Sequence, residues 1–208
     1  MSEADFDRVA RVYRWAEYLA LGRTLERARE YFLPRLKTCK SVLALGDGDG
    51  RFLARLLRQN PQMTAVAVDT SATMLALLRE RCGERVRTVQ LSALEVQAEP
   101  ETDLVVTHFF LDCLTQPEVD ALIKGVGAKL DPGALWVVSD FGPPRVRWLR
   151  PFAAAYVRAL YLAFRILTGL RVTRLPNPQR VLDLADFVRL ERKEFLFGLV
   201  YTELWQRT

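Results

Sequence analysis

The segment G-D-G-D-G at residues 46–50 has three glycines at alternating positions after an apolar stretch. Glycine tolerates the backbone angles of a sharp turn and lets the chain lie close against a ligand. A loop of this kind between a strand and a helix is a candidate site for binding a polar ligand through backbone N–H groups. A tight strand-to-helix turn without any ligand is the simpler interpretation, and the loop alone does not decide between them.

Asp69 ends the next apolar segment, residues 63–69, and follows Gly50 by nineteen positions. A carboxylate there can accept hydrogen bonds from both hydroxyls of an adenosine ribose, as the acid of dinucleotide-binding folds does. In V-D-T-S-A it can also cap a helix, and the two roles are compatible. The spacing G-x-G-x-G disfavours a nicotinamide dehydrogenase, which needs G-x-G-x-x-G.

Three further residues with catalytic chemistry lie near the ends of later apolar segments. His108 is the only histidine and belongs to residues 103–109. Open α/β sheets bind ligands at the carboxyl ends of their strands, and an ordinary histidine pKa of about 6.5 suits a general base. His108 could instead orient a ligand without proton transfer, or only pack. Asp112 is either a second candidate base or a helix-start carboxylate, and Asp140 either binds a substrate hydroxyl or terminates a strand.

These residues sit in a chain that alternates strands and helices, which predicts a parallel sheet with right-handed crossovers. Residues 3–36 read as helices, with a break near Gly22. A short helix at 183–188 and two strands within 189–207, around a turn near Gly198, predict an antiparallel pair at the end. Between these regions we expect strands at 41–47, 63–69, 85–91, 103–109 and 134–141, and helices at 51–59, 72–81 and 117–130.

Four segments in this order resemble the class I S-adenosylmethionine-dependent methyltransferases over residues 5–207: V-L-A-L-G-D-G-D-G, A-V-D-T-S-A-T-M-L, D-L-V-V-T-H-F-F-L-D and L-D-P-G-A-L-W-V-V-S-D-F. The start, F-D-x-x-A-x-x-Y, is similar to the subgroup that includes the ubiquinone/menaquinone C-methyltransferases, which act on small molecules. The resemblance implies an α/β, Rossmann-like three-layer sandwich. Its seven-stranded sheet is mostly parallel with an antiparallel last strand, and it carries N-terminal helices and a helical insert after the fifth strand.

The resemblance also implies S-adenosylmethionine as cofactor and assigns residues to it by position. The glycine loop would line the methionine and ribose portions, Asp69 would bind the ribose, and Tyr13 would close over the site. Two further groups would contact the adenine, and a third would lie under the reactive methyl group. The complete set is Gly46, Asp47, Gly48 and Gly50 for the loop; Asp69; Thr70 and Met74 flanking the adenine; Ser92, Ala93 and Leu94 at its edge; Thr107, His108 and Phe109 under the methyl; and Tyr13.

Two positions depart from the family pattern. The family usually has an acid two residues before the first glycine, where this chain has Ala44, and it often has an aspartate where Ser92 stands. Asp47 would then take over part of the missing polar role, or the ammonium of the cofactor would be held through water. These departures leave a second hypothesis, a non-catalytic relative that binds S-adenosylmethionine or lipid.

Methyl transfer from a sulfonium needs mainly an acceptor held in line with the S–CH₃ bond. A base, for which His108 and Asp112 are the candidates, is needed only when the acceptor must lose a proton. No N-P-P-Y or D-P-P-Y motif follows residues 103–109, which argues against amino methylation of nucleic-acid bases. The predicted acceptor is a small apolar molecule, lipid-like or quinone-like.

The net charge of +5 belongs to one segment. Residues 141–182 contain eight arginines and no Asp, Glu or Lys, so the remainder has 22 basic and 25 acidic residues, a balance of −3. Within it, residues 147–170 predict a helix with a broad apolar surface. This helix is a lid over an apolar acceptor, a contact with an anionic membrane or a second subunit, or a helix packed on the N-terminal helices. Nucleic acid is disfavoured because the segment lacks lysine and any recognition motif.

Composition predicts a folded chain of one domain, with 50% apolar and 26% charged residues over 208 positions. Three cysteines without a C-x-x-C pair predict no disulfide framework and a reducing compartment, and one histidine leaves little material for a metal site. No signal peptide or membrane span is expected, so we predict a cytoplasmic protein, with peripheral membrane contact as an alternative. The domain divides into a helical cap (1–38), a cofactor-binding core (41–141), a basic insert (142–182) and a strand pair (183–208).

Overall fold

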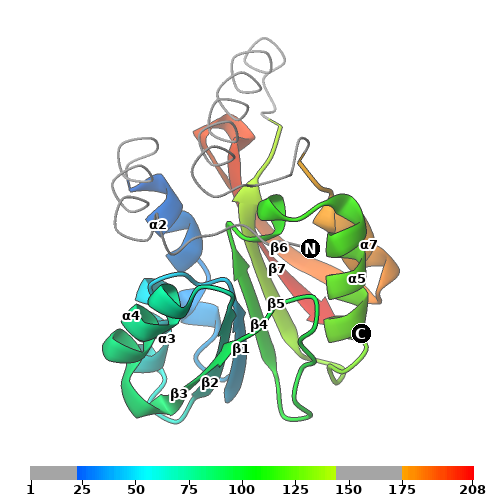
Figure 1. Cartoon of the computed structure of the whole chain (residues 1–208). Coiled ribbons are helices and arrows are strands. Elements are labelled where there is room, and N and C mark those ends of the chain that lie inside the picture. The colour runs from blue at the N-terminus through cyan, green and yellow to red at the C-terminus, as the bar shows by residue number, and fades with distance from the viewer. Residues whose placement is uncertain (1–22, 144–174) are drawn as a thin grey trace.

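The computed structural model describes residues 23–143 and 175–208 (Figure 1). Tyr13, the helices expected before residue 23 and the apolar helix expected at 147–170 lie outside the described residues. Seven strands of the described part form one sheet in the order β3-β2-β1-β4-β5-β7-β6. They are β1 (Ser41–Leu45), β2 (Thr64–Asp69), β3 (Val86–Gln90), β4 (Leu104–His108), β5 (Leu135–Phe141), β6 (Phe187–Phe195) and β7 (Val200–Arg207).

The sheet is parallel except at β7, which runs antiparallel to both of its neighbours, β5 and β6. The other pairs, including the central pair of β1 and β4, are parallel. The predicted fold class is therefore confirmed, as are the five predicted parallel strands and the final antiparallel pair. The order reverses between β1 and β4, which creates a switch point at their carboxyl ends.

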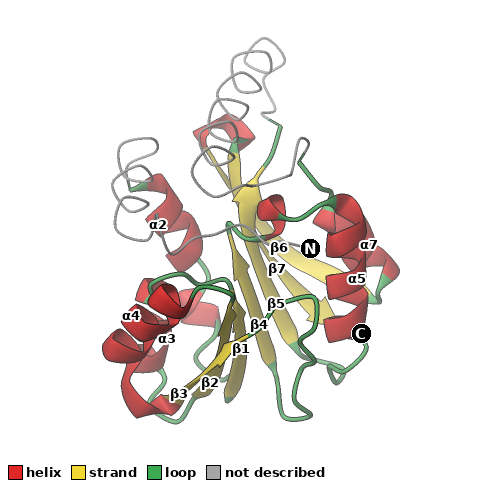
Figure 2. Cartoon of the chain, viewed as in Figure 1, coloured by secondary structure: helices red, strands yellow, loops and turns green. Residues whose placement is uncertain are grey.

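Helices cover both faces of the sheet, which gives three layers (Figure 2). One face carries α3 (Arg51–Gln59) and α4 (Ala72–Cys82), and the other carries α5 (Gln116–Gly127) and α7 (Pro178–Leu184). A further helix, α2 (Thr24–Glu30), packs against β6 and β7. No helix within the described residues is long and apolar enough to span a membrane.

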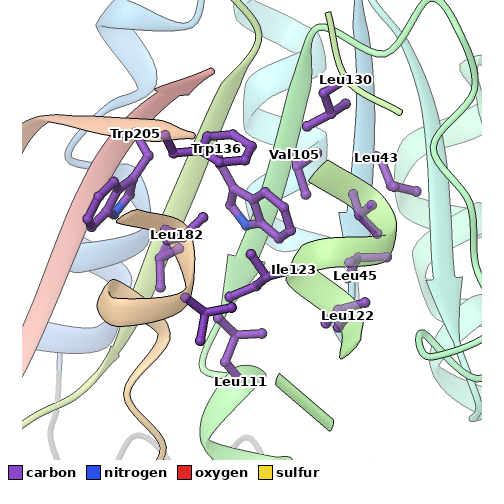
Figure 3. Close-up of a cluster of buried hydrophobic side chains, with 14 of the residues drawn as sticks. Leu43, Leu45, Val105, Leu111, Leu122, Ile123, Leu130, Trp136, Leu182 and Trp205 are labelled. Carbon is purple, nitrogen blue, oxygen red and sulfur yellow. The ribbon is translucent and has the colours of Figure 1, made fainter. Parts of the chain in front are cut away.

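Two large apolar clusters result from the alternation of side chains along the strands. Leu43 and Leu45 of β1 join Trp136 in the cluster beneath α5 and α7 (Figure 3). Ala44, between them, points to the opposite cluster, where it lies fully buried together with Phe52 of α3. The position at which the family usually carries an acid is therefore part of the apolar core.

Local signals explain where the helices begin. Ser71 precedes α4, and its Oγ accepts a hydrogen bond from the Met74 N–H at 3.1 Å. The helices predicted at 51–59, 72–81 and 117–130 match α3, α4 and α5 closely.

The helix predicted at 183–188 was misplaced, because α7 begins at Pro178 and the chain is already in β6 at Phe187. Asn177 caps α7 by accepting the Arg180 N–H at 3.2 Å, and Pro178 supplies a pre-set first-turn angle. The helix therefore crosses the predicted boundary between residues 182 and 183, and it packs on α5.

Candidate functional site

The glycine loop turns sharply between β1 and α3. Gly46, Gly48 and Gly50 have φ angles of +63°, +63° and +76°, which favour glycine. A Cβ atom added to Gly46 would lie 2.3 Å from a ring carbon of Phe110, whereas one added to Gly48 would meet nothing within 4 Å. The loop is thus packed against the protein at Gly46 and open at Gly48, where a ligand could approach the backbone.

The two aspartates of the loop have different surroundings. Asp49 accepts hydrogen bonds from Arg51 Nε at 2.9 Å and from Arg81 Nη2 at 3.1 Å, so its charge is balanced. Within the described residues, the Asp47 carboxylate accepts a hydrogen bond only from a backbone group, the Leu53 N–H, at 3.2 Å. Burial raises the pKa of Asp47 to about 7 although Arg29 opposes the shift. Asp47 is therefore the loop acid available to a cationic ligand group.

Asp69 and the turn after β3 lie side by side at the carboxyl edge of the sheet. The Leu91 N–H donates to the Asp69 carbonyl at 3.2 Å, which draws residues 91–94 toward the end of β2. Asp69 Oδ1 accepts the Ser71 N–H at 2.9 Å, so the carboxylate also fixes the turn before α4. The predicted adenine contacts occupy this region: Thr70 and Ser92 are half-buried, Met74 and Ala93 are buried, and Leu94 is exposed.

Thr107 faces the core and lies away from the loop. Its side chain is fully buried, and its hydroxyl accepts the indole N–H of Trp136 at 3.1 Å. Because β4 alternates its side chains, Thr107 points toward α5 while His108 points toward α3. The structure therefore places Thr107 in the core with a protein hydrogen bond, and its predicted contact under the methyl group stays a prediction.

Phe109 follows β4 with a φ angle of +54°, which is unusual for a residue with a side chain. Its ring is buried with Leu25 and Ala28 of α2. Such strain persists only where the surrounding structure holds it, and it is common at functional sites. Phe109 thus links the end of β4 to α2 through its side chain.

His108 is buried at the end of β4, with its ring 4.3 Å from that of Phe52. Its Nδ1 lies 2.9 Å from Ser139 Oγ, which in turn lies 2.7 Å from Thr202 Oγ1. Its other nitrogen, Nε2, is buried and has no hydrogen-bond partner among the described residues. Burial and the positive charge of Arg29 hold the pKa of His108 well below 6.5, which makes it a weak base.

Asp112 and Asp140 form a buried carboxyl pair on the opposite face. Asp140 accepts the Asp112 N–H at 3.1 Å and the Phe141 N–H at 2.9 Å, and the two side chains hydrogen-bond to each other. Burial raises the pKa of Asp112 to about 6 and that of Asp140 well above its usual range. A carboxyl–carboxyl hydrogen bond requires one proton, so near neutral pH the pair holds one proton and one negative charge.

Arg29 of α2 is a site residue that sequence reasoning missed. Its guanidinium lies 5.0 Å from the centroid of the Phe109 ring, and its charge lowers the pKa of both Asp47 and His108. Three elements distant in sequence therefore meet at the carboxyl ends of β1 and β4. Nothing in the sequence distinguishes Arg29 from the other arginines near it, because only the fold brings it to the loop.

Residues 42–133 match the family model described as "Methyltransferase domain". This segment is similar to methyltransferase domains. The matched segment includes the glycine loop, Asp69, His108 and Asp112, and it runs from β1 to the turn before β5. No curated protein matches the chain.

Solved structures share the fold of this chain at low sequence identity. One is a 1,6-didemethyltoxoflavin-N1-methyltransferase from Burkholderia thailandensis, whose structure contains 1,6-didemethyltoxoflavin and S-adenosylhomocysteine. It is 22% identical to this chain with a TM-score of 0.64, and the match covers 100% of this chain and 92% of that one. The mitomycin 7-O-methyltransferase MmcR is 14% identical with a TM-score of 0.66, over 99% and 64% of the two chains. An O-methyltransferase family protein from Burkholderia thailandensis is 19% identical with a TM-score of 0.68, over 97% and 62%. The chain thus spans less than two thirds of the length of several of its structural relatives.

Proposed function

We propose that the protein transfers a methyl group from S-adenosylmethionine to a small-molecule acceptor. The observation that carries the proposal is the convergence of three features at the carboxyl ends of neighbouring strands. These features are the loop open at Gly48, the carboxylate of Asp69, and the turn of residues 91–94. They lie beside the switch point of the sheet, where open α/β folds bind their ligands.

The residues fit the chemical groups of this cofactor. The open backbone at Gly48 would hold the methionine and ribose portion, the Asp69 carboxylate would accept the ribose hydroxyls, and buried Ala93 would offer an apolar contact to the adenine. The bound cofactor supplies a sulfonium that is already an active methyl donor. What the chain must do is hold the acceptor atom in line with the methyl group and keep water out.

For an acceptor that loses a proton, we propose Asp112 as the base in preference to His108. A catalytic base works best with a pKa near the operating pH, and the pKa of Asp112 is raised to about 6. His108 has the lowered pKa of a buried imidazole. Protonated Asp140 would donate a hydrogen bond to the ionised Asp112 carboxylate and keep it oriented.

The proposed acceptor is small and apolar, lipid-like or quinone-like. The choice of an apolar acceptor is supported by the F-D-x-x-A-x-x-Y start of the sequence and by the apolar sequence of residues 147–170. We propose that residues 147–170 serve as a lid over the acceptor. A membrane contact or a second subunit at the same segment remains an alternative use of its apolar surface. Both parts of the sequence lie outside the described residues.

A non-catalytic relative is the second candidate function. The observation in its favour is Ala44, because a fully buried alanine stands where the family usually carries an acid. Such a protein would bind S-adenosylmethionine without transferring its methyl group.

Calorimetry with S-adenosylhomocysteine, followed by incubation with methyl-labelled S-adenosylmethionine and a panel of quinols, phenols and fatty acids, tests the proposal. Binding together with label in a product supports the enzyme. Binding without transfer to any acceptor favours the non-catalytic relative. No binding at millimolar ligand would overturn both.

Replacing Asp69 with alanine is expected to weaken S-adenosylhomocysteine binding about 100-fold, because hydrogen bonds from two hydroxyls to a charged carboxylate are lost. Calorimetry measures the effect. Ser71→Ala is the matched control, since it removes the α4 cap and about 1 kcal/mol of stability while it keeps the carboxylate. Equal weakening in both variants would mean that Asp69 acts only through the turn.

Binding of S-adenosylhomocysteine is expected to weaken about tenfold between pH 8 and pH 6, because Asp47 must be ionised to pair with the ligand's ammonium group. The pKa of Asp47 is raised to about 7. Below that pH, Asp47 must lose a proton before it can pair with the ammonium group, which weakens binding. Within residues 23–143 and 175–208, the charged groups that act on Asp47 are Arg29, Asp49 and Arg51. Calorimetry between pH 6 and pH 8 should show no pH dependence of S-adenosylhomocysteine affinity for Asp47→Asn. If the affinity of that variant fell with pH as in the wild-type protein, Asp47 would not be the group that pairs with the ammonium.

A further inference from the structure

We infer that the protein has a second binding site, a cavity between the sheet and the segment that joins β3 to β4, and that this site takes a small apolar amine. The cavity has a volume of about 260 Å³, and its lining comes from β1, β2, β3 and residues 91–102. The glycine loop, Asp69 and His108 contribute nothing to the lining. The site is therefore separate from the proposed cofactor site, and the inference does not depend on the proposed function.

The cavity exists because the connection from β3 to β4 has no helix. Parallel strands are usually joined by a helix that covers the sheet, whereas residues 91–103 form turns and extended chain. The side chains that this connection buries against the sheet are small, Ala93 and Ala98. Val66 and Val89 on the strands consequently stay only partly buried. On the other face, α4 packs directly on β2 and β3.

The floor of the cavity is apolar. Leu43 pairs with Val66, and Val66 pairs with Arg87, so the three lie in a row across the sheet. Val89 and Leu91 follow Arg87 on the same face. A small apolar molecule on this floor would remove its own surface and that of the strands from water, which favours binding. Since an apolar cavity of about 150 Å³ holds benzene, this one has room for one ring with a short side chain.

Thr102 adds a buried hydroxyl to the wall of the cavity. The residue is 6% exposed, and its backbone N–H donates to the Glu99 carbonyl at 2.9 Å. Its side-chain hydroxyl, however, has no hydrogen-bond partner within residues 23–143 and 175–208. Because a buried polar group without a partner costs free energy, a ligand that hydrogen-bonds to this hydroxyl would recover that cost. The cavity therefore favours an apolar ligand with one polar end.

The charges at the border of the cavity determine which polar end fits. Arg87 forms an ion pair with Glu99, and both side chains are more than half exposed. Glu95 also lines the cavity, and it has no ion pair within the part of the chain that the structure describes. Two carboxylates against one guanidinium leave the border negative, which favours a cation over an anion. An ammonium group can also donate to the Thr102 hydroxyl, so the ligand class is an amine.

NMR of methyl groups in the wild-type chain tests the site with three probes that share one ring: 2-phenylethylamine, 2-phenylethanol and phenylacetate. The amine should shift the methyl signals of Val66 and Val89 and bind about 3- to 10-fold more tightly than the alcohol. Phenylacetate should bind more weakly than the alcohol. Leu56, which is buried on the opposite face, is the internal control and should not shift. No shift of Val66 and Val89 at millimolar amine, or equal binding of amine and acid, would overturn the inference.

Substitutions in the cavity test its parts. Thr102→Val keeps the shape of the side chain but removes the hydroxyl, so it should weaken amine binding about fivefold without lowering the free energy of unfolding. Glu95→Gln should reduce the preference for amine over alcohol. Val89→Phe should fill the cavity and abolish binding of both, while Val188→Phe, at an exposed position of β6, is the matched control and should change neither. Full binding in Val89→Phe, or in Thr102→Val should Val89→Phe fail to fold, would show that the amine binds elsewhere.

S-adenosylhomocysteine separates this inference from the proposed function. The amine and S-adenosylhomocysteine should bind to the wild-type protein at the same time, because the cavity and the glycine loop share no residue. Displacement of the amine by S-adenosylhomocysteine would place the amine in the cofactor site and overturn the second site. If S-adenosylhomocysteine does not bind while the amine shifts Val66 and Val89, the proposed function fails and the second site stands.

Discussion

Replacing Gly46 with alanine is expected to destabilise the protein by about 3 kcal/mol and to abolish measurable binding of S-adenosylhomocysteine. The methyl group would lie 2.3 Å from Phe110 Cδ2 and 2.9 Å from Phe110 Cγ, so the ring would have to move. The backbone would also keep a φ angle of +63°, which strains any residue with a Cβ atom. Phe110 follows the end of β4, so its displacement would disturb both strands that flank the switch point.

Alanine variants of two other glycines distinguish the clash with Phe110 from the backbone strain as the cause of the stability loss in Gly46→Ala. Gly83 and Gly48 have φ angles of +71° and +63°, and a Cβ atom on either would meet nothing within 4 Å. Each alanine variant should therefore lose only about 1–2 kcal/mol through backbone strain. Gly48→Ala should also weaken ligand binding, because its methyl group enters the open side of the loop, while Gly83→Ala should not.

Urea denaturation of the three variants, followed by calorimetry with S-adenosylhomocysteine, measures both quantities. If Gly46→Ala were no less stable than Gly83→Ala, the contact between Gly46 and Phe110 would not hold the loop. If Gly48→Ala bound the ligand as tightly as the wild-type protein, the open side of the loop would not be the binding side.

Most of the fold follows from features that are local in sequence. Apolar segments of five to seven residues, separated by amphipathic helices, predict parallel strands because both faces of such a sheet are covered. The misplaced helix at 183–188 shows what local patterns can miss. Asn177 and Pro178 are a start signal for α7, but the signal lies inside the arginine-rich segment of residues 141–182, five residues before the predicted start at residue 183.

The candidate site was predictable where the chemistry is carried by neighbours in sequence. The glycine loop and Asp69 belong to this group. Arg29 and the Phe110 ring were not predictable, because their positions depend on how α2 and the end of β4 pack against the loop. The core contact of Thr107 was not predictable for a related reason: the register of β5 brings Trp136 within reach of its hydroxyl, and no sequence pattern reports that contact.

The contact between the Asp112 and Asp140 carboxyl groups was also not predictable from the sequence. The sequence marks Asp112 and Asp140 as separate candidates, each with a structural alternative. Only the parallel pairing of β4 with β5 brings the turn after β4 onto the end of β5. Two buried carboxyls in contact then share a proton, and that property belongs to the pair.

Replacing Asp112 with asparagine is expected to raise the free energy of unfolding at pH 8 by up to about 3 kcal/mol. The pKa of Asp112 is about 6 in the folded chain because burial disfavours its charged form, against about 3.9 for an ordinary aspartate. The folded chain therefore binds more protons than the unfolded chain between about pH 4 and pH 6, and wild-type stability falls as the pH rises through this window. Asparagine does not ionise, so the variant does not lose stability as the pH rises. The difference in free energy of unfolding between the variant and the wild-type protein should therefore shrink toward pH 5.

The same substitution should slow methyl transfer by about 10²- to 10⁴-fold, because asparagine cannot accept the proton of an acceptor hydroxyl. Urea denaturation between pH 5 and pH 8 measures the first effect, and transfer from labelled S-adenosylmethionine to an acceptor turned over by the wild-type protein measures the second. Asp131→Asn, at an exposed position before β5, should change neither. A variant that is more stable and fully active would make the pair a structural feature alone. A gain in stability together with a loss of transfer is the result expected of a buried charge that is kept for catalysis at a cost to the fold.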